Sequence, residues 1–215
     1  MGKGEPKQYL NLSGRPILAH TLAPFLAISA ITRICLVIPK QDHGRCRETI
    51  LDRLDDREKE IVQLVSGGRE RYDSVYNGLA AVSDRRGVVL VHDGVRPFVT
   101  PDQILACIRS AASKGACLLA LPVVDTLKSA TPDRVVTRTI DRARIWRAQT
   151  PQAFQFDLLY RAHRKARAEG CGATDDAHLV EALGVPVHIL PGNRRNIKIT
   201  TPDDLALAEA ILAAG

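Results

Sequence analysis

Apolar and polar positions vary along the chain in a way that predicts short strands separated by helices. Runs of Val, Ile and Leu predict the strands, and several runs are apolar at consecutive positions, which is typical of parallel strands buried on both faces. The predicted strands cover residues 34–39, 61–66, 88–92, 117–124 and 187–190. Strands that alternate with helices in this way predict a parallel sheet with right-handed crossovers.

The clearest helical pattern covers residues 101–114, where apolar side chains recur on one side. Thr100 fits the N-cap position, Pro101 the first helical position, and Gln103 the partner position of a capping box. A first helix is predicted at 16–26, and two more begin at Thr174-Asp175-Asp176 and Thr201-Pro202-Asp203-Asp204. We therefore predict one α/β domain over 1–215, with a doubly wound, mostly parallel sheet.

Residues 128–146 interrupt this alternation. They are polar and rich in β-forming residues, and they leave no room for a helix. The segment therefore predicts a two-stranded β-arm that protrudes from the sheet. Such an arm exposes strand edges unless a partner covers them.

Composition narrows the class of protein. With 45% hydrophobic residues and a net charge of +6, the chain is an ordinary folded protein rather than a disordered one. Basic residues outnumber acidic ones by 30 to 24, but aromatic residues make up only 4%, so a base-stacking surface for nucleic acid is poorly supplied. Small anionic substrates are the better prediction, with neither nucleic acid nor a membrane as partner.

Neither a membrane anchor nor a metal site is indicated. The longest apolar run, 116–124, is too short to span a bilayer, and the first residues are charged, so we expect a cytoplasmic protein. The 5 cysteines are scattered and form no C-x-x-C pair. They are predicted to be reduced thiols in or near the core, and no ligand spacing for zinc is present.

Ligands of parallel sheets bind where the strands end, so the residues that follow each strand are candidates. Gly67 and Gly68 follow the strand at 61–66 and are followed by Ser74. Paired glycines let an anion approach backbone amides at the start of a helix. The alternative is an ordinary turn with an N-cap, and the segment taken alone favours this alternative.

Asp93 and Arg96 follow the strand at 88–92. Arg can hold a phosphate with two hydrogen bonds, and Asp can bind a hydroxyl group or a hydrated metal ion. A local ion pair that closes the loop is the alternative, and the sequence does not favour either.

The remaining candidates are weak one by one. Thr126, Arg142 and Thr150 stand in segments that usually form turns or caps. Lys198 lies between two Ile residues, and Lys7 precedes the first helix, so both are by default lysines exposed to solvent.

Taken in order, these segments resemble one family. The chain contains PKQYL, GGRERYDSV, VHDGVRPF, PVVDTLK, DRARIWRAQTPQAF, TDDA and NIKITTPDDL, a series typical of the 2-C-methylerythritol 4-phosphate cytidylyltransferases of the non-mevalonate isoprenoid pathway. The resemblance covers residues 6–210. It implies transfer of CMP from CTP to methylerythritol phosphate with release of pyrophosphate, a divalent ion such as Mg²⁺, and a homodimer whose arms interlock.

The resemblance also implies a role for each candidate. Lys7 and Lys198 would hold the triphosphate and its reacting α-phosphorus, and Gly67, Gly68 and Ser74 would contact the cytosine end of CTP. The methylerythritol phosphate would be held by Asp93, Arg96 and Thr150, and by Thr126 and Arg142 from the arm of the partner subunit. No protein ligand for the metal ion is assigned.

The resemblance implies a strand and an A-A-G-x-G-x-R-M loop ahead of these motifs. Met1 aligns with the last residue of that loop, so we expect translation to start upstream of Met1. One alternative is that the protein begins at Met1 and is a non-catalytic binder of CTP or of a sugar phosphate. The other alternative is a ribitol-phosphate cytidylyltransferase, which shares the fold and several motifs.

Overall fold

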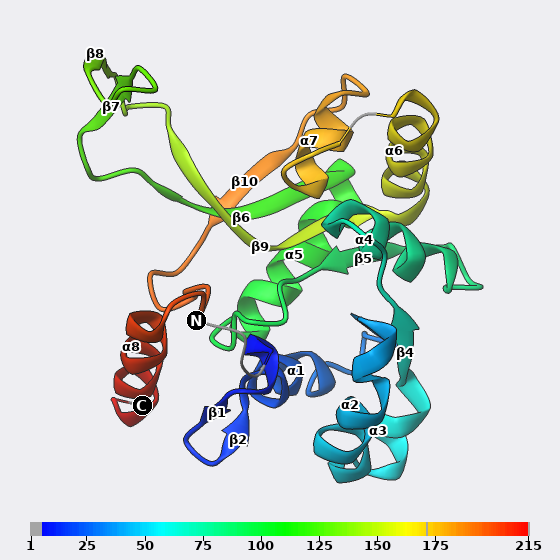
Figure 1. Cartoon of the computed structure of the whole chain (residues 1–215). Coiled ribbons are helices and arrows are strands. Elements are labelled where there is room, and N and C mark those ends of the chain that lie inside the picture. Colours follow the sequence, from blue (N-terminus) through cyan, green and yellow to red (C-terminus); the bar gives the residue numbers. More distant parts are fainter. Residues whose placement is uncertain (1–5, 171, 215) are drawn as a thin grey trace.

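The computed structural model describes residues 6–170 and 172–214, and Figure 1 shows their path. The strands are β1 (Asn11–Leu12), β2 (Arg15–Pro16), β3 (Ile34–Ile38), β4 (Val62–Ser66), β5 (Val88–Val91), β6 (Ala116–Pro122), β7 (Leu127–Ala130), β8 (Val136–Ile140), β9 (Trp146–Gln155) and β10 (His188–Pro191). The helices are α1 (Ile17–Leu26), α2 (His43–Thr49), α3 (Asp56–Ile61), α4 (Arg71–Ala80), α5 (Pro101–Lys114), α6 (Phe156–Glu169), α7 (Asp176–Glu181) and α8 (Pro202–Ala213), with short 3-10 turns η1 (Lys7–Tyr9), η2 (Lys40–Asp42) and η3 (Leu51–Arg53). The predicted α/β fold is confirmed, and the expected boundary at Met1 lies outside the described residues.

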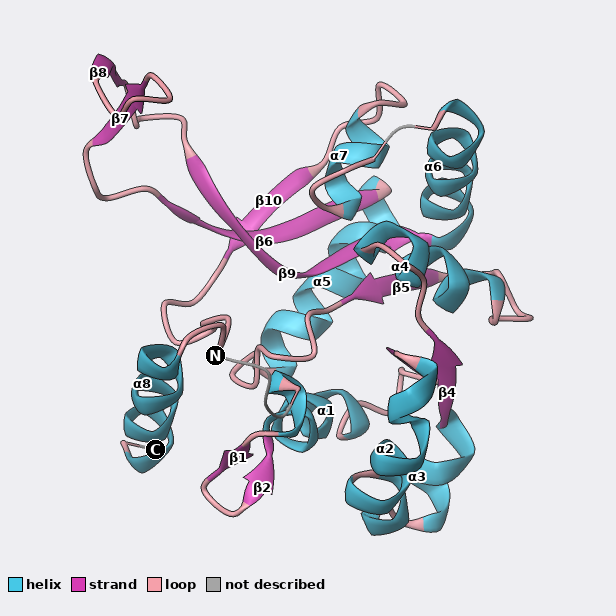
Figure 2. Cartoon of the chain, in the orientation of Figure 1, coloured by secondary structure: helices cyan, strands magenta, loops and turns pink. Residues whose placement is uncertain are grey.

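A four-stranded sheet in the order β10–β6–β9–β5 forms the larger part of the core (Figure 2). Side chains of β6 alternate between its two faces. Leu118 packs into a cluster with residues of α6 and α7, whereas Cys117 and Leu119 pack into a cluster with residues of α5. Helices therefore cover both faces, which explains the consecutive apolar positions in the sequence.

The smaller sheet is the parallel pair β3–β4. Its core contains Leu22 of α1, Leu36 and Ile38 of β3, and Cys46 of α2. Within the described residues no backbone pairing joins this pair to the four-stranded sheet. The structure therefore has two separate sheets where the sequence predicts a single, mostly parallel one, and the larger sheet contains an antiparallel strand.

That antiparallel strand, β9, is missed by the sequence pattern. It pairs antiparallel with both β6 and β5, because the chain returns from β6 to β9 through the arm and not through a crossover helix. Pro151 lies in its middle, where proline argues against a strand. The ladder accommodates the proline by a register shift, since Leu118 pairs with Gln152 and Ala120 already pairs with Ala148.

The predicted excursion at 128–146 corresponds to the antiparallel hairpin β7–β8, which Figure 1 shows beyond the ends of β6 and β9 and away from the helices. Unlike the core, it exposes large apolar side chains. Val135, Val136 and Trp146 are 63%, 57% and 44% exposed. A protruding hairpin with exposed apolar residues is typical of a surface that a partner covers.

The predicted helix signals are confirmed. Thr100 accepts a hydrogen bond from the amide of Gln103, with the reciprocal bond present and Pro101 in the first turn of α5. Thr201 caps α8 in the same manner, and the side chain of Asp175 caps α7. None of the helices in the described ranges is both long and apolar enough to cross a membrane.

Candidate functional site

Four of the predicted site residues lie together at the end of β5, and we call them the Asp93 cluster: Asp93, Arg96, Thr150 and Lys198. One carboxylate oxygen of Asp93, Oδ2, lies 3.1 Å from Nε of Arg96 and 3.1 Å from Nζ of Lys198. The backbone amide of Asp93 donates to Oγ1 of Thr150 at 3.1 Å. Residues more than 50 positions apart in the chain thus meet around one carboxylate.

The two cations of this cluster change the pKa of Asp93. Burial alone raises the pKa of the Asp93 carboxyl, but the positive charges of Lys198 and Arg96 outweigh it, so the pKa is lower than usual. Asp93 is therefore ionised at neutral pH and leaves one net positive charge on the trio. The side chain of Lys198 is 44% exposed, against 13% for Arg96 and for Asp93, so Lys198 is the cation best able to turn toward a ligand.

Thr150 is held by a second set of polar side chains that the sequence patterns did not single out. Asn196 is fully buried and donates from Nδ2 to the carbonyl of Thr150 at 2.8 Å. Gln149 donates from Nε2 to the carbonyls of Asn193 and Asn196, at 2.9 and 3.2 Å. The guanidinium of Arg96 also donates to the carbonyl of Asn196 at 2.9 Å, so the segment that precedes Lys198 is bonded to both β9 and the loop after β5.

His92 spans the loop that carries Asp93 and Arg96. Its Nε2 lies 3.0 Å from the carbonyl oxygen of Arg96, and its Nδ1 lies 3.0 Å from Oγ1 of Thr150. The ring of Phe25 packs against it with the centroids 5.0 Å apart. Burial lowers the pKa of His92 to about 4, so the imidazole is neutral at pH 7.

The two predicted glycines and Ser74 form a second group, the turn between β4 and α4. The amide of Gly68 donates to Oγ of Ser74 at 3.0 Å, and the Ser74 hydroxyl donates to the carbonyl of Glu70 at 3.2 Å. A Cβ at Gly68 would lie 2.2 Å from Cβ of Asp73, so only glycine fits this close approach. The turn explanation is thus sound, but it does not exclude binding, because Ser74 also lines a cleft.

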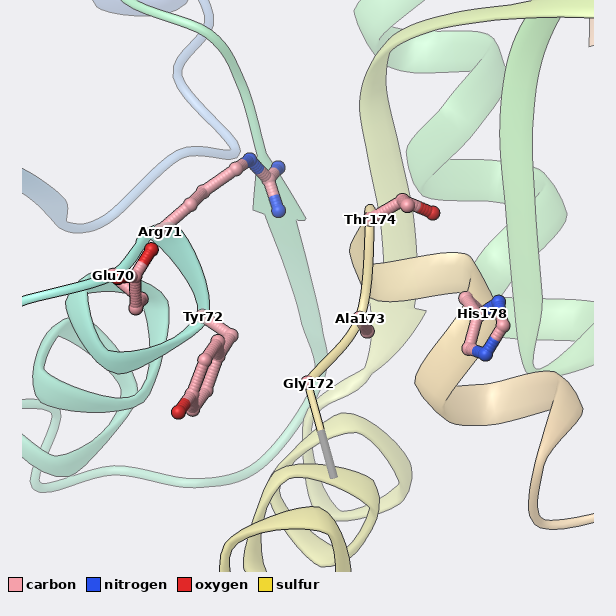
Figure 3. Close-up of a pocket in the computed structure, with 7 residues that line it drawn as sticks. All are labelled: Glu70, Arg71, Tyr72, Gly172, Ala173, Thr174 and His178. Carbon is pink, nitrogen blue, oxygen red and sulfur yellow. The ribbon is translucent and has the colours of Figure 1, made fainter. Parts of the chain in front are cut away.

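Arg71 joins the two groups, and no sequence pattern singled it out as a site residue. Its NH1 lies 2.7 Å from Oδ2 of Asp176, and its Nε lies 4.0 Å from Oδ1 of Asp93. Asp176 is completely buried and accepts from Nε2 of His163 at 2.9 Å. Arg71 also lines a small pocket of about 470 Å³ between the start of α4 and residues 172–178, which Figure 3 draws.

A larger cleft of about 770 Å³ contacts both groups and both sheets. Aliphatic side chains of β3, β5, α1 and α4 line most of it, and its polar lining includes Gln8, Arg71, Ser74, His92 and Asp93. Apolar walls with a few polar groups are common in ligand sites, and of the predicted site residues Ser74 and Asp93 line this cleft.

The remaining predicted residues lie apart from the Asp93 cluster. Lys7 lies in η1, directly before Gln8 of the cleft. Thr126 is exposed at the base of the arm, and Arg142 is exposed within it and donates to the carbonyl of Val124. Thus the chain brings Asp93, Arg96, Thr150 and Lys198 together, and it does not bring Thr126 and Arg142 to them.

The described residues offer no metal cage. They contain no group of three or more His, Cys, Asp or Glu side chains able to hold an ion. The one carboxylate of the Asp93 cluster already has two cationic partners at 3.1 Å and Arg71 at 4.0 Å.

A cleft at strand ends, with a glycine turn and a lysine–arginine pair around one carboxylate, defines an α/β enzyme for phosphorylated substrates. Residues 1–214 match the family model of 2-C-methyl-D-erythritol 4-phosphate cytidylyltransferase, and the chain belongs to that family. It is 47% identical over its full length to the enzyme of that name from Pelotomaculum thermopropionicum and covers 89% of it. It is also 47% identical to a bifunctional IspD/IspF enzyme from Desulforudis audaxviator, of which it covers 54%.

Solved structures agree with the sequence relatives. A 4-diphosphocytidyl-2C-methyl-D-erythritol synthase from Anaerococcus prevotii superimposes with a TM-score of 0.87 at 34% identity, covering 99% of this chain and 92% of that one. The 2-C-methyl-D-erythritol 4-phosphate cytidylyltransferase from Thermus thermophilus gives 0.80 at 35% identity, covering 98% and 95%. The resemblance inferred from seven motifs is thus confirmed as family membership.

Proposed function

We propose that this chain transfers CMP from CTP to 2-C-methyl-D-erythritol 4-phosphate in the cleft beside the Asp93 cluster. The observation that carries the assignment to this cleft is the convergence of Lys198, Arg96 and Thr150 on Asp93. The reaction needs two phosphate groups to meet despite their negative charges. Fixed cations beside the cleft, held by its lining residue Asp93, reduce that repulsion and stabilise the charge that develops in the transition state.

Each predicted residue has a role in this proposal. Asp93, Arg96 and Thr150 hold the methylerythritol phosphate, with Arg96 on its phosphate. Lys198, the most exposed cation of the Asp93 cluster, and Lys7 next to Gln8 neutralise the triphosphate of CTP. The turn of Gly67, Gly68 and Ser74 receives the cytosine end. The phosphate oxygen of the substrate then attacks the α-phosphorus in line, and pyrophosphate leaves.

Magnesium enters this proposal as part of the substrate. Mg²⁺ keeps several waters and binds readily to phosphate oxygens with one or two carboxylates at most. Because the described residues form no cage, we propose that the ion arrives bound to the phosphates of CTP. The protein's own task is then to orient the complex.

Two further parts of the proposal concern assembly. We propose a homodimer in which Thr126 and Arg142 reach the cleft of the partner subunit, since both are exposed and lie apart from their own cluster. We also propose that β3–β4 and the four-stranded sheet are two parts of one doubly wound sheet. Residues of β3 and β5 line the same cleft, and residues of α1 and α4 complete its walls.

The assay that tests the proposed function is pyrophosphate release by the purified protein with CTP, Mg²⁺ and either of two acceptors. We expect turnover with methylerythritol phosphate to exceed turnover with ribitol 5-phosphate by at least about tenfold in kcat/KM. Equal or faster turnover with ribitol 5-phosphate would overturn the acceptor. Tight CTP binding without turnover of either acceptor would indicate a non-catalytic binder.

A further inference from the structure

We propose that His92 is a positioning residue whose Nδ1 orients the hydroxyl of Thr150, and through it Asp93, for the phosphorylated acceptor. This inference rests on the proposed role of Thr150 and adds a residue to which the motifs assign no role. His92 directly follows β5, lines the cleft and contacts the carbonyl of Arg96 and the hydroxyl of Thr150.

The hydrogen bonds fix which nitrogen of the neutral ring carries the hydrogen. Nε2 faces the carbonyl oxygen of Arg96 at 3.0 Å, and a carbonyl can only accept, so Nε2 carries a hydrogen. In a neutral imidazole the other nitrogen is then an acceptor. Nδ1 therefore accepts the hydrogen of the Thr150 hydroxyl, whose oxygen lies 3.0 Å away.

Thr150 completes the link to Asp93. Its hydroxyl oxygen donates one hydrogen bond to His92 and accepts another from the amide of Asp93 at 3.1 Å. The direction of its O–H bond is thus set by the ring nitrogen, and the position of the Asp93 backbone is set by Thr150. Because Asp93 in turn holds Arg96, the cation proposed to bind the acceptor phosphate, a small displacement at Thr150 moves that guanidinium.

The surroundings keep the ring neutral. The charged groups that face it, Asp93 and Arg96, belong to its own segment and have opposite signs. From the other elements it contacts Phe25 of α1 and Thr150 of β9, neither of which carries a charge. The ring therefore serves as a fixed donor and acceptor, and it is not assigned a proton transfer.

Two substitutions separate the two hydrogen bonds of the ring. In His92→Asn the amide oxygen replaces Nδ1 and can still accept from Thr150, but no group reaches the carbonyl of Arg96. In His92→Gln the amide nitrogen replaces Nε2 and can still donate to Arg96, but a carbon replaces the acceptor for Thr150. A variant pair at His188, which lies on β10 at the far edge of the sheet, controls for loss of a histidine as such.

We expect His92→Gln to raise the KM for methylerythritol phosphate about tenfold, with the KM for CTP and the melting temperature little changed. His92→Asn should stay within about threefold of the wild type. In a Thr150→Val background, His92→Gln should have no further effect, because the hydroxyl that it orients is already gone.

The outcomes separate this inference from the proposed function. If Thr150→Val alone leaves the KM for methylerythritol phosphate unchanged, the assigned role of Thr150 is wrong. If Thr150→Val raises that KM but the Asn and Gln variants at His92 behave alike, or Asn is the more impaired, the inference about Nδ1 is overturned and the role of Thr150 stands. A His92→Gln protein that melts well below His188→Gln would assign His92 to folding instead.

Discussion

The Asp93 cluster and the β-arm contain the two groups of residues proposed for the acceptor, and they are built in opposite ways. In the cluster, Asp93 and Arg96 are largely buried, and Thr150 and Lys198 reach Asp93 from distant parts of the chain. In the arm, Thr126 and Arg142 are exposed, and large apolar side chains point into solvent. The contacts of the cluster are made within one chain, whereas exposed apolar residues are typical of a surface that a partner covers, which supports the proposed dimer.

The largest effect is expected inside the cluster. Replacing Lys198 by Ala removes the most exposed cation and should lower kcat/KM about 100-fold, which corresponds to about 3 kcal/mol of transition-state stabilisation. Steady-state pyrophosphate release measures this. Lys165→Ala, which removes an exposed lysine of α6 that pairs only weakly with Glu169, is the matched control and should be as active as the wild type. A fully active Lys198→Ala protein would contradict the role of the cluster.

The pH dependence of stability should show how well His92, beside the Asp93 cluster, is shielded from water. The pKa of His92 is lowered to about 4 in the folded protein, while the unfolded chain has the ordinary histidine value. Between about pH 6.5 and pH 4 the histidine is protonated in the unfolded chain but not in the folded protein. The free energy of unfolding is therefore unaffected by this group above about pH 6.5 and falls as the pH drops toward 4. The contribution of His92 to this loss is up to about 3 kcal/mol.

Urea unfolding of the wild type and of His92→Gln at pH 7.5 and pH 5 measures this contribution. The difference in unfolding free energy between the two pH values should be smaller in His92→Gln, because the variant has no group at that position to protonate. Equal differences in both proteins would mean that His92 titrates normally and that water enters this part of the cleft.

Complementation tests whether the arm serves a second chain. Lys198→Ala and Arg142→Ala homodimers should each be nearly inactive. Mixed dimers have one site in which both residues are intact, so equal mixing should restore about a quarter of wild-type activity. Native mass spectrometry confirms subunit exchange. Exchange without recovery would show that Arg142 acts within its own chain or not at all.

The smallest effect is expected at the tip of the arm. Val136→Lys places a charge on an exposed apolar surface, so the folding of one chain should change little, while the dimer dissociation constant should rise about tenfold or more. Sedimentation at several protein concentrations measures this. Leu207→Lys, an equally exposed apolar position on α8, is the control and should leave the dimer intact.

The sequence predicts the parts of the fold that are encoded locally. The five apolar runs correspond to β3, β4, β5, β6 and β10, and the capping box at Thr100 marks the start of α5. Here side-chain periodicity and cap chemistry act within a few residues, so they can be recognised without the rest of the chain.

Features that depend on distant contacts could not be predicted. β9 is a strand despite Pro151, because β5 and β6 pair with it on either side and the register shift tolerates the proline. Arg71, Gln149 and Asn196 became part of the site only through partners far away in sequence. The four predicted residues of the Asp93 cluster lie together in the structure. Lys198 became a candidate through the motif resemblance, and not through the spacing of residues along the chain.

One consequence concerns β9, which is continuous from Trp146 to Gln155. Its first three residues are exposed next to the arm, and from Gln149 to Phe154 it is buried. At about 3.3 Å per residue, Thr150 lies only about 13 Å along the strand from Trp146. The strand thus connects the exposed residues next to the arm to the hydroxyl proposed to contact the acceptor. The proposed dimer contact and the proposed acceptor contact therefore lie on one strand, with the register shift of β9 between them.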